Sequence, residues 1–394
     1  MKALTWQSSK KVEVKSVPDP VIEKPTDVVI RITSAAICGS DLHLYNVMGP
    51  FLAQDDVLGH ENMGIVEVVG ADVTTLSVGD RVVIPFVIAC GDCFMCNQGL
   101  TTQCETTQNR DSGTGASLYG FSELYGSVPG GQAERVRVPH ADFGPILLTS
   151  DLPDERFLYL SDILPTAWQA VDYADVGGND TLAVLGLGPV GQLALRSALH
   201  RGVGRVIAVD LVDDRLALAR SWGAEVVDVR DVDEVSDALK DLTDGRGPDA
   251  VIDAVGMEAH GNPLSEKVIA AAGRMPKPVA RAAIEHVGID RLSALHTAVA
   301  AVRRGGTLSV SGVYGGMADP MPMMDLFDKG ITMRMGQCHV RRWSDDLLDL
   351  VSGADDVLGL ESLATHHAPL DAAPDLYRTF QEKSDGCLKV VLKP

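Results

Sequence analysis

The most constraining feature of this sequence is a regular alternation of strand and helix patterns that begins near Thr166. Short apolar runs rich in β-branched residues are separated by stretches with helical periodicity. The predicted strands lie in the segments TLAVLGLG, RVIAVD, AEVVDV, DAVIDAVG and GGTLSVSGVYGG. Strands that are apolar along their whole length and joined by helices favour right-handed βαβ units and a parallel sheet. We therefore expect an α/β domain with a doubly wound parallel sheet.

The first of these strands leads directly into the segment VLGLGPVG. Its glycines Gly186, Gly188 and Gly191 have the spacing G-x-G-x-x-G, which is informative only where a strand precedes it and a helix follows, as here. Such glycines permit a tight turn, the approach of a pyrophosphate and close packing of the helix on the strand. The helix N-terminus then offers N–H groups to the phosphates. The motif predicts a Rossmann-type dinucleotide site.

An acidic residue, Asp210, ends the next predicted strand. A carboxylate at this place binds the two ribose hydroxyls and repels a 2′-phosphate, so it favours NAD over NADP. The predicted cofactor site also includes Pro189 and Val190 within the glycine motif, and Arg215 in the following helix. The alternative is a purely structural βαβ turn with a solvated Asp210.

The first third of the chain has a different pattern, with short β-rich segments punctuated by Pro and Gly. The last residues, GCLKVVLKP, are typical of a strand that rejoins this region. We therefore predict a β-rich domain over residues 1–165, a cofactor domain over 166–335 and a return to the first domain over 336–394. A long Ala-rich segment, Met257 to Arg304, has helical periodicity and no assigned role.

Composition narrows the compartment and the partners. The 34 Lys and Arg residues against 54 Asp and Glu give a formal net charge of −20, which disfavours nucleic acid and anionic membranes. The N-terminus has no apolar run typical of a signal peptide, and no stretch is long enough for a membrane span. We expect a cytoplasmic protein, in which cysteine thiols remain reduced.

Four of the seven cysteines lie within one short segment, CGDCFMCNQGLTTQC. A redox centre, a disulfide knot, an iron–sulfur cluster and a metal site are all conceivable uses of such a group. Reducing conditions disfavour disulfides, and the spacing departs from C-x2-C-x2-C-x3-C-P, which is typical of iron–sulfur proteins. A closed tetrahedral zinc site is the favoured interpretation. Its ligands would be Cys90, Cys93, Cys96 and Cys104.

Upstream of the cysteines lie the segments ICGSDLH and LGHENMG. The second continues to Gly70 and Val73 as G-H-E-x2-G-x5-G-x2-V, which resembles the zinc signature of the medium-chain alcohol dehydrogenases. The four-cysteine segment and the later glycine motif match that family in the same order, so the resemblance covers nearly the whole chain. YLSDILPTAWQAV is similar to the branch containing glutathione-independent formaldehyde dehydrogenases. The resemblance implies a GroES-like catalytic domain beside the Rossmann domain.

The resemblance also implies a catalytic zinc held by Cys38, His60 and Asp162, with the fourth position left for water or substrate. Glu61 adjoins His60 and is either a residue behind the metal or a rival of Asp162 as third ligand. Taken alone, Cys38 could be a buried apolar residue and Asp162 a helix cap.

The same family places a proton relay and a phosphate contact at further positions. Ser40 and His43 correspond to a hydroxyl and a surface imidazole that pass the alcohol proton to solvent. Lys389 corresponds to a basic residue that reaches the pyrophosphate, although an ordinary exposed lysine is the alternative.

The predicted function is hydride transfer between NAD and a small alcohol, or a hydrated aldehyde such as formaldehyde, with two zinc ions per chain. A polyol or threonine dehydrogenase is one alternative, in which Glu61 would hold the metal. A catalytically silent NAD-binding protein is another. Bacterial relatives are often tetramers, so a homo-oligomer, and a tetramer above others, is expected.

Overall fold

The computed structural model describes residues 1–256, 292–314 and 320–394. Of the helical pattern predicted within Met257–Arg304, the part up to residue 291 therefore lies outside the described residues. The chain divides into two compact units, Met1–Pro165 with Cys338–Pro394, and Thr166–Gln337. The sequence predicts these breaks after residues 165 and 335.

The first unit is built on a seven-stranded sheet in the order β14-β15-β3-β4-β5-β7, with β6 paired to β3. Every strand pair in it is antiparallel except β14 with β15. The strands are β3 (Val28–Ile37), β4 (Glu61–Val69), β5 (Arg81–Ile84), β6 (Arg135–Val138), β7 (Ile146–Leu148), β14 (His366–Pro369) and β15 (Val390–Lys393). β15, in the C-terminal tail, pairs with β3.

A two-stranded sheet and several helices complete this unit. Its further elements are β1 (Lys2–Ser8), β2 (Lys11–Ser16), α1 (Gly39–Asn46), α2 (Phe94–Asn97), α3 (Asp154–Phe157), α12 (Val340–Val351) and α13 (Ala373–Glu382), with short 3-10 turns that include η2 (Thr101–Gln103) and η5 (Leu158–Ser161). In α13 the buried residues Ala373, Tyr377 and Phe380 recur at helical spacing, so one face of the helix joins the core formed with β1 and α1.

The second unit contains a six-stranded sheet in the order β10-β9-β8-β11-β12-β13, and all its pairs are parallel. Numbered within the unit this is the order 3-2-1-4-5-6, which defines the dinucleotide-binding doubly wound fold. The strands are β8 (Thr181–Leu185), β9 (Arg205–Asp210), β10 (Glu225–Asp228), β11 (Ala250–Asp253), β12 (Thr307–Val310) and β13 (Thr332–Met335). The α/β prediction is thus confirmed.

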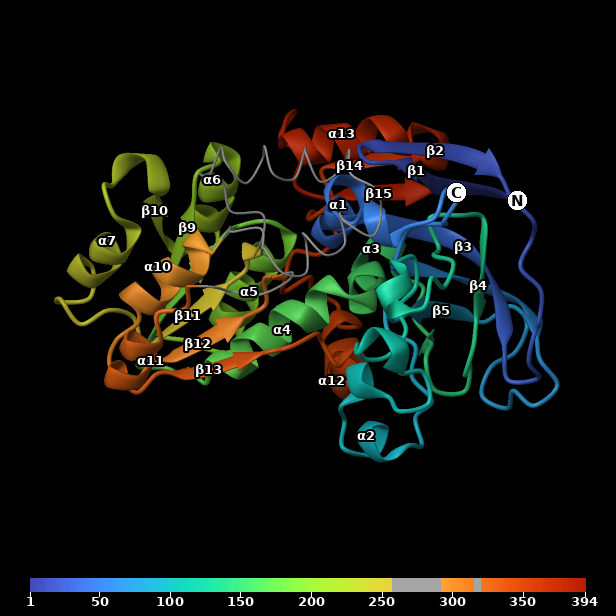
Figure 1. Ribbon diagram of the computed structural model, residues 1–394, viewed down its shortest axis with the longest axis horizontal. Helices are drawn as coiled ribbons and strands as arrows, with labels where there is room; N and C mark the ends of the chain where they lie inside the picture. The colour runs from blue at the N-terminus through green and yellow to red at the C-terminus, as the bar shows by residue number, and fades with distance from the viewer. Residues whose placement is uncertain (257–291, 315–319) are drawn as a thin grey trace. The chain divides into compact units, whose positions relative to one another are not determined.

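The helices of this unit connect successive strands. They are α5 (Pro189–His200), α6 (Asp213–Ser221), α7 (Val235–Asp241), α10 (Ser293–Ala301) and α11 (Met323–Lys329), while α4 (Ile163–Ala174) crosses the boundary between the units (Figure 1). β8 and β11 are buried along almost their whole length, as expected for central parallel strands with both faces covered. Their carboxyl ends flank the point where the strand order reverses, which is where ligands bind in such sheets.

Candidate metal and cofactor sites

The four clustered cysteines come together in the first unit. One ligand atom from each of Cys90, Cys93, Cys96 and Cys104 lies within 4.8 Å of the others, and no disulfide joins them. Cys93 precedes α2, Cys96 lies within that helix, and Cys104 follows the turn η2. The disulfide interpretation is therefore wrong for these thiols.

Their geometry suits one closed metal site. The Sγ of Cys104 lies 3.6 Å from that of Cys90 and 3.9 Å from that of Cys93, close to the roughly 3.8 Å between sulfurs in a tetrahedral zinc–thiolate site. Burial raises the pKa of Cys104, but hydrogen bonds from Thr107 and from the Cys90 N–H outweigh it and lower the pKa to about 6. A thiol that ionises readily is prepared to bind a metal, and four thiolates leave no position open for chemistry.

A second cluster joins residues from three distant segments of the first unit. Cys38 lies between β3 and α1, His60 precedes β4, and Asp162 lies between η5 and α4. Ligand atoms of these residues and of Glu61 all lie within 4.8 Å of one another, and all four residues are buried. The structure thus brings together the predicted ligands of the catalytic zinc.

The charges of this cluster fit a divalent cation. The Oδ2 of Asp162 lies 3.6 Å from the Cys38 Sγ and 3.3 Å from the His60 Nε2. Burial, together with the negative charges of Glu61 and Asp162, raises the pKa of the Cys38 thiol to about 11. A bound cation would reverse this, because it stabilises the thiolate and balances the buried carboxylate of Asp162. Soft sulfur, imidazole and carboxylate together are a donor set that zinc accepts.

Glu61 is already paired with Lys389, which corrects one prediction. The Lys389 Nζ lies 2.7 Å from the Glu61 Oε1 and 2.6 Å from its Oε2, and it also donates to the Ile37 carbonyl. Both side chains are fully buried. The alternative of an ordinary exposed lysine is therefore wrong for Lys389, whose ammonium neutralises Glu61. The pairing favours Asp162 over Glu61 as the third metal ligand.

Asp41 is a functional residue that the sequence analysis missed. Its Oδ1 lies 3.1 Å from the His60 Nδ1, and it is fully buried. Because a carboxylate only accepts hydrogen bonds, Asp41 favours the His60 tautomer with its proton on Nδ1, which leaves Nε2 to bind a metal. A signal was present, since Asp41 lies in the segment CGSDLH, three residues after Cys38.

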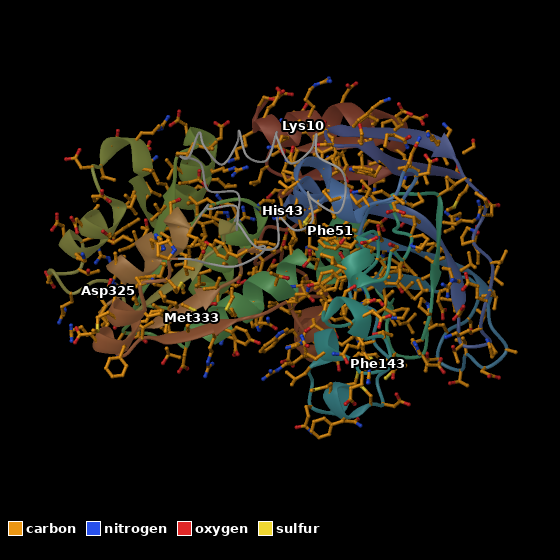
Figure 2. The ribbon with its side chains drawn as sticks, viewed as in Figure 1. Lys10, His43, Phe51, Phe143, Asp325 and Met333 are labelled. Atoms are coloured by element: carbon orange, nitrogen blue, oxygen red, sulfur yellow. The ribbon has the colours of Figure 1, made fainter. Side chains whose placement is uncertain are left out.

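Ser40 and His43, which are predicted to pass the alcohol proton to solvent, both lie on α1. The Ser40 Oγ is 3.1 Å from the His60 Nε2, so this hydroxyl lies at the candidate metal site. His43, labelled in Figure 2, is buried with 7% of its surface exposed. The expectation of a surface imidazole is wrong, because the turn that carries His43 packs into the protein.

The glycine motif has the close contacts that its role requires. Gly186 has φ +84°, and a Cβ on Gly191 would lie 1.8 Å from the Gly186 carbonyl oxygen, so no side chain fits there. At Gly188, by contrast, the nearest atom is an Arg215 nitrogen 3.9 Å away, which leaves room for a ligand. Gly188 immediately precedes α5. Pro189 has no N–H group, so the free N–H donors of the first helical turn begin at Val190.

Asp210 ties the end of β9 to the glycine loop. Its Oδ2 accepts a hydrogen bond from the Leu187 N–H at 2.6 Å, and its Oδ1 accepts from the Leu211 N–H at 2.7 Å. Arg215 Nη1 lies 4.0 Å from the same carboxylate. The predicted cofactor residues of the second unit, from Gly186 to Arg215, therefore gather at the carboxyl end of β8 and β9.

Comparisons with known proteins agree with both units. Residues 24–147 match the family model of the alcohol dehydrogenase GroES-like domain, and residues 189–275 match that of the zinc-binding dehydrogenases. An uncharacterized zinc-type alcohol dehydrogenase-like protein of Bacillus subtilis is 43% identical over the whole of both chains. The glutathione-independent formaldehyde dehydrogenase of Pseudomonas aeruginosa is 38% identical over 263 residues, 64% of each chain.

A solved structure supports the same relationship. The alcohol dehydrogenase of Thermus sp. ATN1 has a TM-score of 0.81 and 31% identity, over 100% of this chain and 99% of that one. Among the described residues, none of the helices has the length and apolar character needed to cross a membrane.

Proposed function

Because this chain belongs to the zinc-dependent medium-chain alcohol dehydrogenase family and is an oxidoreductase of that class, we propose that it oxidises a small alcohol, or hydrated formaldehyde, with NAD. The proposal assigns the catalytic zinc to Cys38, His60 and Asp162, and a structural zinc to the four clustered cysteines. The observation that carries it is the convergence of three buried ligands from separate segments on one point, with ligand atoms within 4.8 Å.

The reaction removes a hydride and a proton from the substrate. Zinc, when bound, supplies a Lewis acid that lowers the pKa of an alcohol hydroxyl beside it. The hydroxyl proton would leave through Ser40, whose Oγ lies 3.1 Å from the His60 Nε2. NAD, if held by the glycine motif and Asp210, would supply the acceptor for the hydride of the carbinol carbon, so that the alcohol leaves as the aldehyde. Hydrated formaldehyde carries two hydroxyls on one carbon, so the same loss of hydride and proton yields formic acid.

The substrate class rests on Asp162 and on one relative. An acid at this position is the feature shared with the formaldehyde dehydrogenase branch, and a relative named for glutathione-independent formaldehyde oxidation is 38% identical over 263 residues. The polyol or threonine alternative requires Glu61 on the metal, and the ion pair between Glu61 and Lys389 speaks against it. A silent protein would have no need for the complete ligand set.

Metal content and a substrate screen test the proposal together. We expect two zinc ions per chain by mass spectrometric metal analysis, and NAD reduction with formaldehyde or primary alcohols in steady-state assays. Cys38→Ser should reduce zinc to about one per chain and abolish activity, because the catalytic site loses a ligand. One zinc per chain in the parent protein would favour the silent protein, and activity restricted to polyols would favour the other dehydrogenase class.

The proposal includes a cytoplasmic homo-oligomer, with a tetramer favoured by the resemblance. Reduced cysteines are the form that binds zinc, which supports a reducing compartment. Exposed apolar side chains on α11 and β13 support self-association, among them Met324, Phe327 and Met335, which are 74%, 85% and 60% exposed. In the described part of the chain β13 pairs only with β12, so its other backbone edge can pair with a second copy.

A further inference from the structure

A chain of buried polar groups extends from His60 to the C-terminal helix of the first unit. The Asp41 Oδ2 accepts hydrogen bonds from the Cys38 N–H at 3.0 Å and from the Gln132 Nε2 at 3.2 Å. The Gln132 Oε1 in turn accepts a hydrogen bond of 2.8 Å from the Tyr377 hydroxyl. Asp41, Gln132 and Tyr377 are all fully buried. We call Asp41, Gln132 and Tyr377 the relay.

The direction of every hydrogen bond in the relay is fixed by chemistry. The Gln132 Nε2 also donates to the Ala36 carbonyl at 3.0 Å, so its two acceptors are a carbonyl and a carboxylate. Neither can donate, and the amide nitrogen must therefore face them while the amide oxygen faces Tyr377. Burial raises the pKa of Tyr377 well above its usual range, so its hydroxyl keeps the proton that it donates. These bonds leave the Asp41 Oδ1 beside the His60 Nδ1, at 3.1 Å.

The backbone holds Gln132 in this place. Its N–H donates to the Leu58 carbonyl at 3.0 Å, and the Gly131 N–H donates to the Gly59 carbonyl at 2.9 Å, so the segment runs beside the residues that lead into His60. A Cβ on Gly59 would lie 2.4 Å from the Gln132 Cγ. The side chain of Gln132 thus lies between Gly59, which precedes His60, and the C-terminal end of β3, where it contacts Ala36.

We propose that Gln132 and Tyr377 are positioning residues for the catalytic metal, acting through Asp41 on His60. The inference rests on the proposed zinc site and deepens it. Asp41 holds His60 in the tautomer whose Nε2 binds metal, and partners of this kind behind a ligand typically change metal affinity by about 10- to 100-fold. Gln132 and Tyr377 hold Asp41 in turn. The helix α13, which carries Tyr377, therefore contributes to the zinc affinity of the catalytic site.

Release of zinc to a coloured chelator tests the relay without using activity. Tyr377→Phe removes one hydroxyl and keeps the ring, and we expect it to speed loss of the catalytic zinc on the order of fivefold, the effect of one lost hydrogen bond. Tyr45→Phe is the matched control: its ring centroid lies 5.6 Å from that of Tyr377 in the same core cluster. Among the described residues no hydrogen bond joins the Tyr45 hydroxyl to the relay. The zinc of the four cysteines is an internal reference.

Cobalt substitution and a double variant complete the test. With Co²⁺ at the catalytic site, Tyr377→Phe should shift the visible absorption bands, and Tyr45→Phe should leave them unchanged. Gln132→Met should already interrupt the relay, so adding Tyr377→Phe should bring little further loss of zinc. Equal zinc release from the parent and Tyr377→Phe, or additive effects in the double variant, would overturn the relay.

Asp41→Asn separates failure of the relay from failure of the proposed site. If Asp41→Asn speeds zinc release and Tyr377→Phe does not, the metal site stands and the relay is wrong. If the parent protein holds only the zinc of the four cysteines, the proposed catalytic zinc site is wrong, and the relay, which positions a ligand of that zinc, is wrong with it.

Discussion

Asp210 has two roles at the end of β9, and this decides what its substitution should do. Its carboxylate accepts hydrogen bonds from the backbone of Leu187 and Leu211, and it lies where a ribose is expected. Asp210→Asn should therefore raise KM for NAD and shift the ratio of kcat/KM for NAD over NADP by about 10-fold or more toward NADP, because a charged hydrogen-bond acceptor is lost.

Steady-state kinetics with both cofactors measure this change. Asp214→Asn removes the same charge from an exposed position on α6 and should leave both constants unchanged. An unaltered cofactor preference in Asp210→Asn would remove Asp210 from the cofactor site.

Single residues were predictable where a motif fixes both type and spacing. The four cysteines and the trio of Cys38, His60 and Asp162 lie together as such patterns suggest. Gln132 and Tyr377 belong to no motif, since their role depends on a fold that brings together residues 245 positions apart. The burial of Lys389 was unpredictable for the same reason, because only the folded chain places Glu61 beside it.

At the scale of elements, His339 joins α12 to the four-cysteine segment and makes that contact sensitive to pH. Its Nδ1 accepts a hydrogen bond from the Thr102 N–H at 3.3 Å in the turn η2. Burial, assisted by the charge of Arg342, lowers the pKa of His339 from its usual 6.5 to about 4. The unfolded chain therefore binds a proton that the folded chain does not bind between these two pH values.

Stability should consequently fall as pH decreases from about 6.5 toward 4, by at most roughly 3 kcal/mol from this residue. His339→Gln lacks the titration, so its Tm should decline less steeply than that of the parent over this range. Thermal unfolding at half-unit pH steps measures the two slopes. Parallel curves for the two proteins would show that His339 does not titrate differently in the folded state.

The regular elements followed from apolar periodicity, and the exceptions have physical causes. β8, β9, β11 and the return strand β15 were predicted, because buried strands are continuously apolar. β13 was missed: its sequence TMRM is mostly exposed, as befits the edge of a sheet, so it lacks the apolar pattern of a central strand. β7 was likewise not predicted, since it is only three residues long.

At the scale of the whole molecule, the exposed apolar face of α11 and β13 should determine the state of association. Asp325 and Met333, labelled in Figure 2, mark these two elements. Phe327 on α11 is 85% exposed, and a large apolar side chain so placed gains most by being covered. A two-fold axis would set the same face of a second copy against it, because an isologous interface needs only one self-complementary patch.

Phe327→Asp should therefore dissociate the proposed oligomer toward the 41.9 kDa chain, because a closed interface would have to bury an unpaired carboxylate. Light scattering coupled to gel filtration measures the mass. Val78→Asp introduces the same charge at a side chain that is 67% exposed in the first unit, and should leave the mass unchanged. If Val78→Asp dissociates the protein and Phe327→Asp does not, the contact between copies lies on the first unit. In that case the charge of Arg334 on β13 would explain why this edge strand does not pair with a second copy.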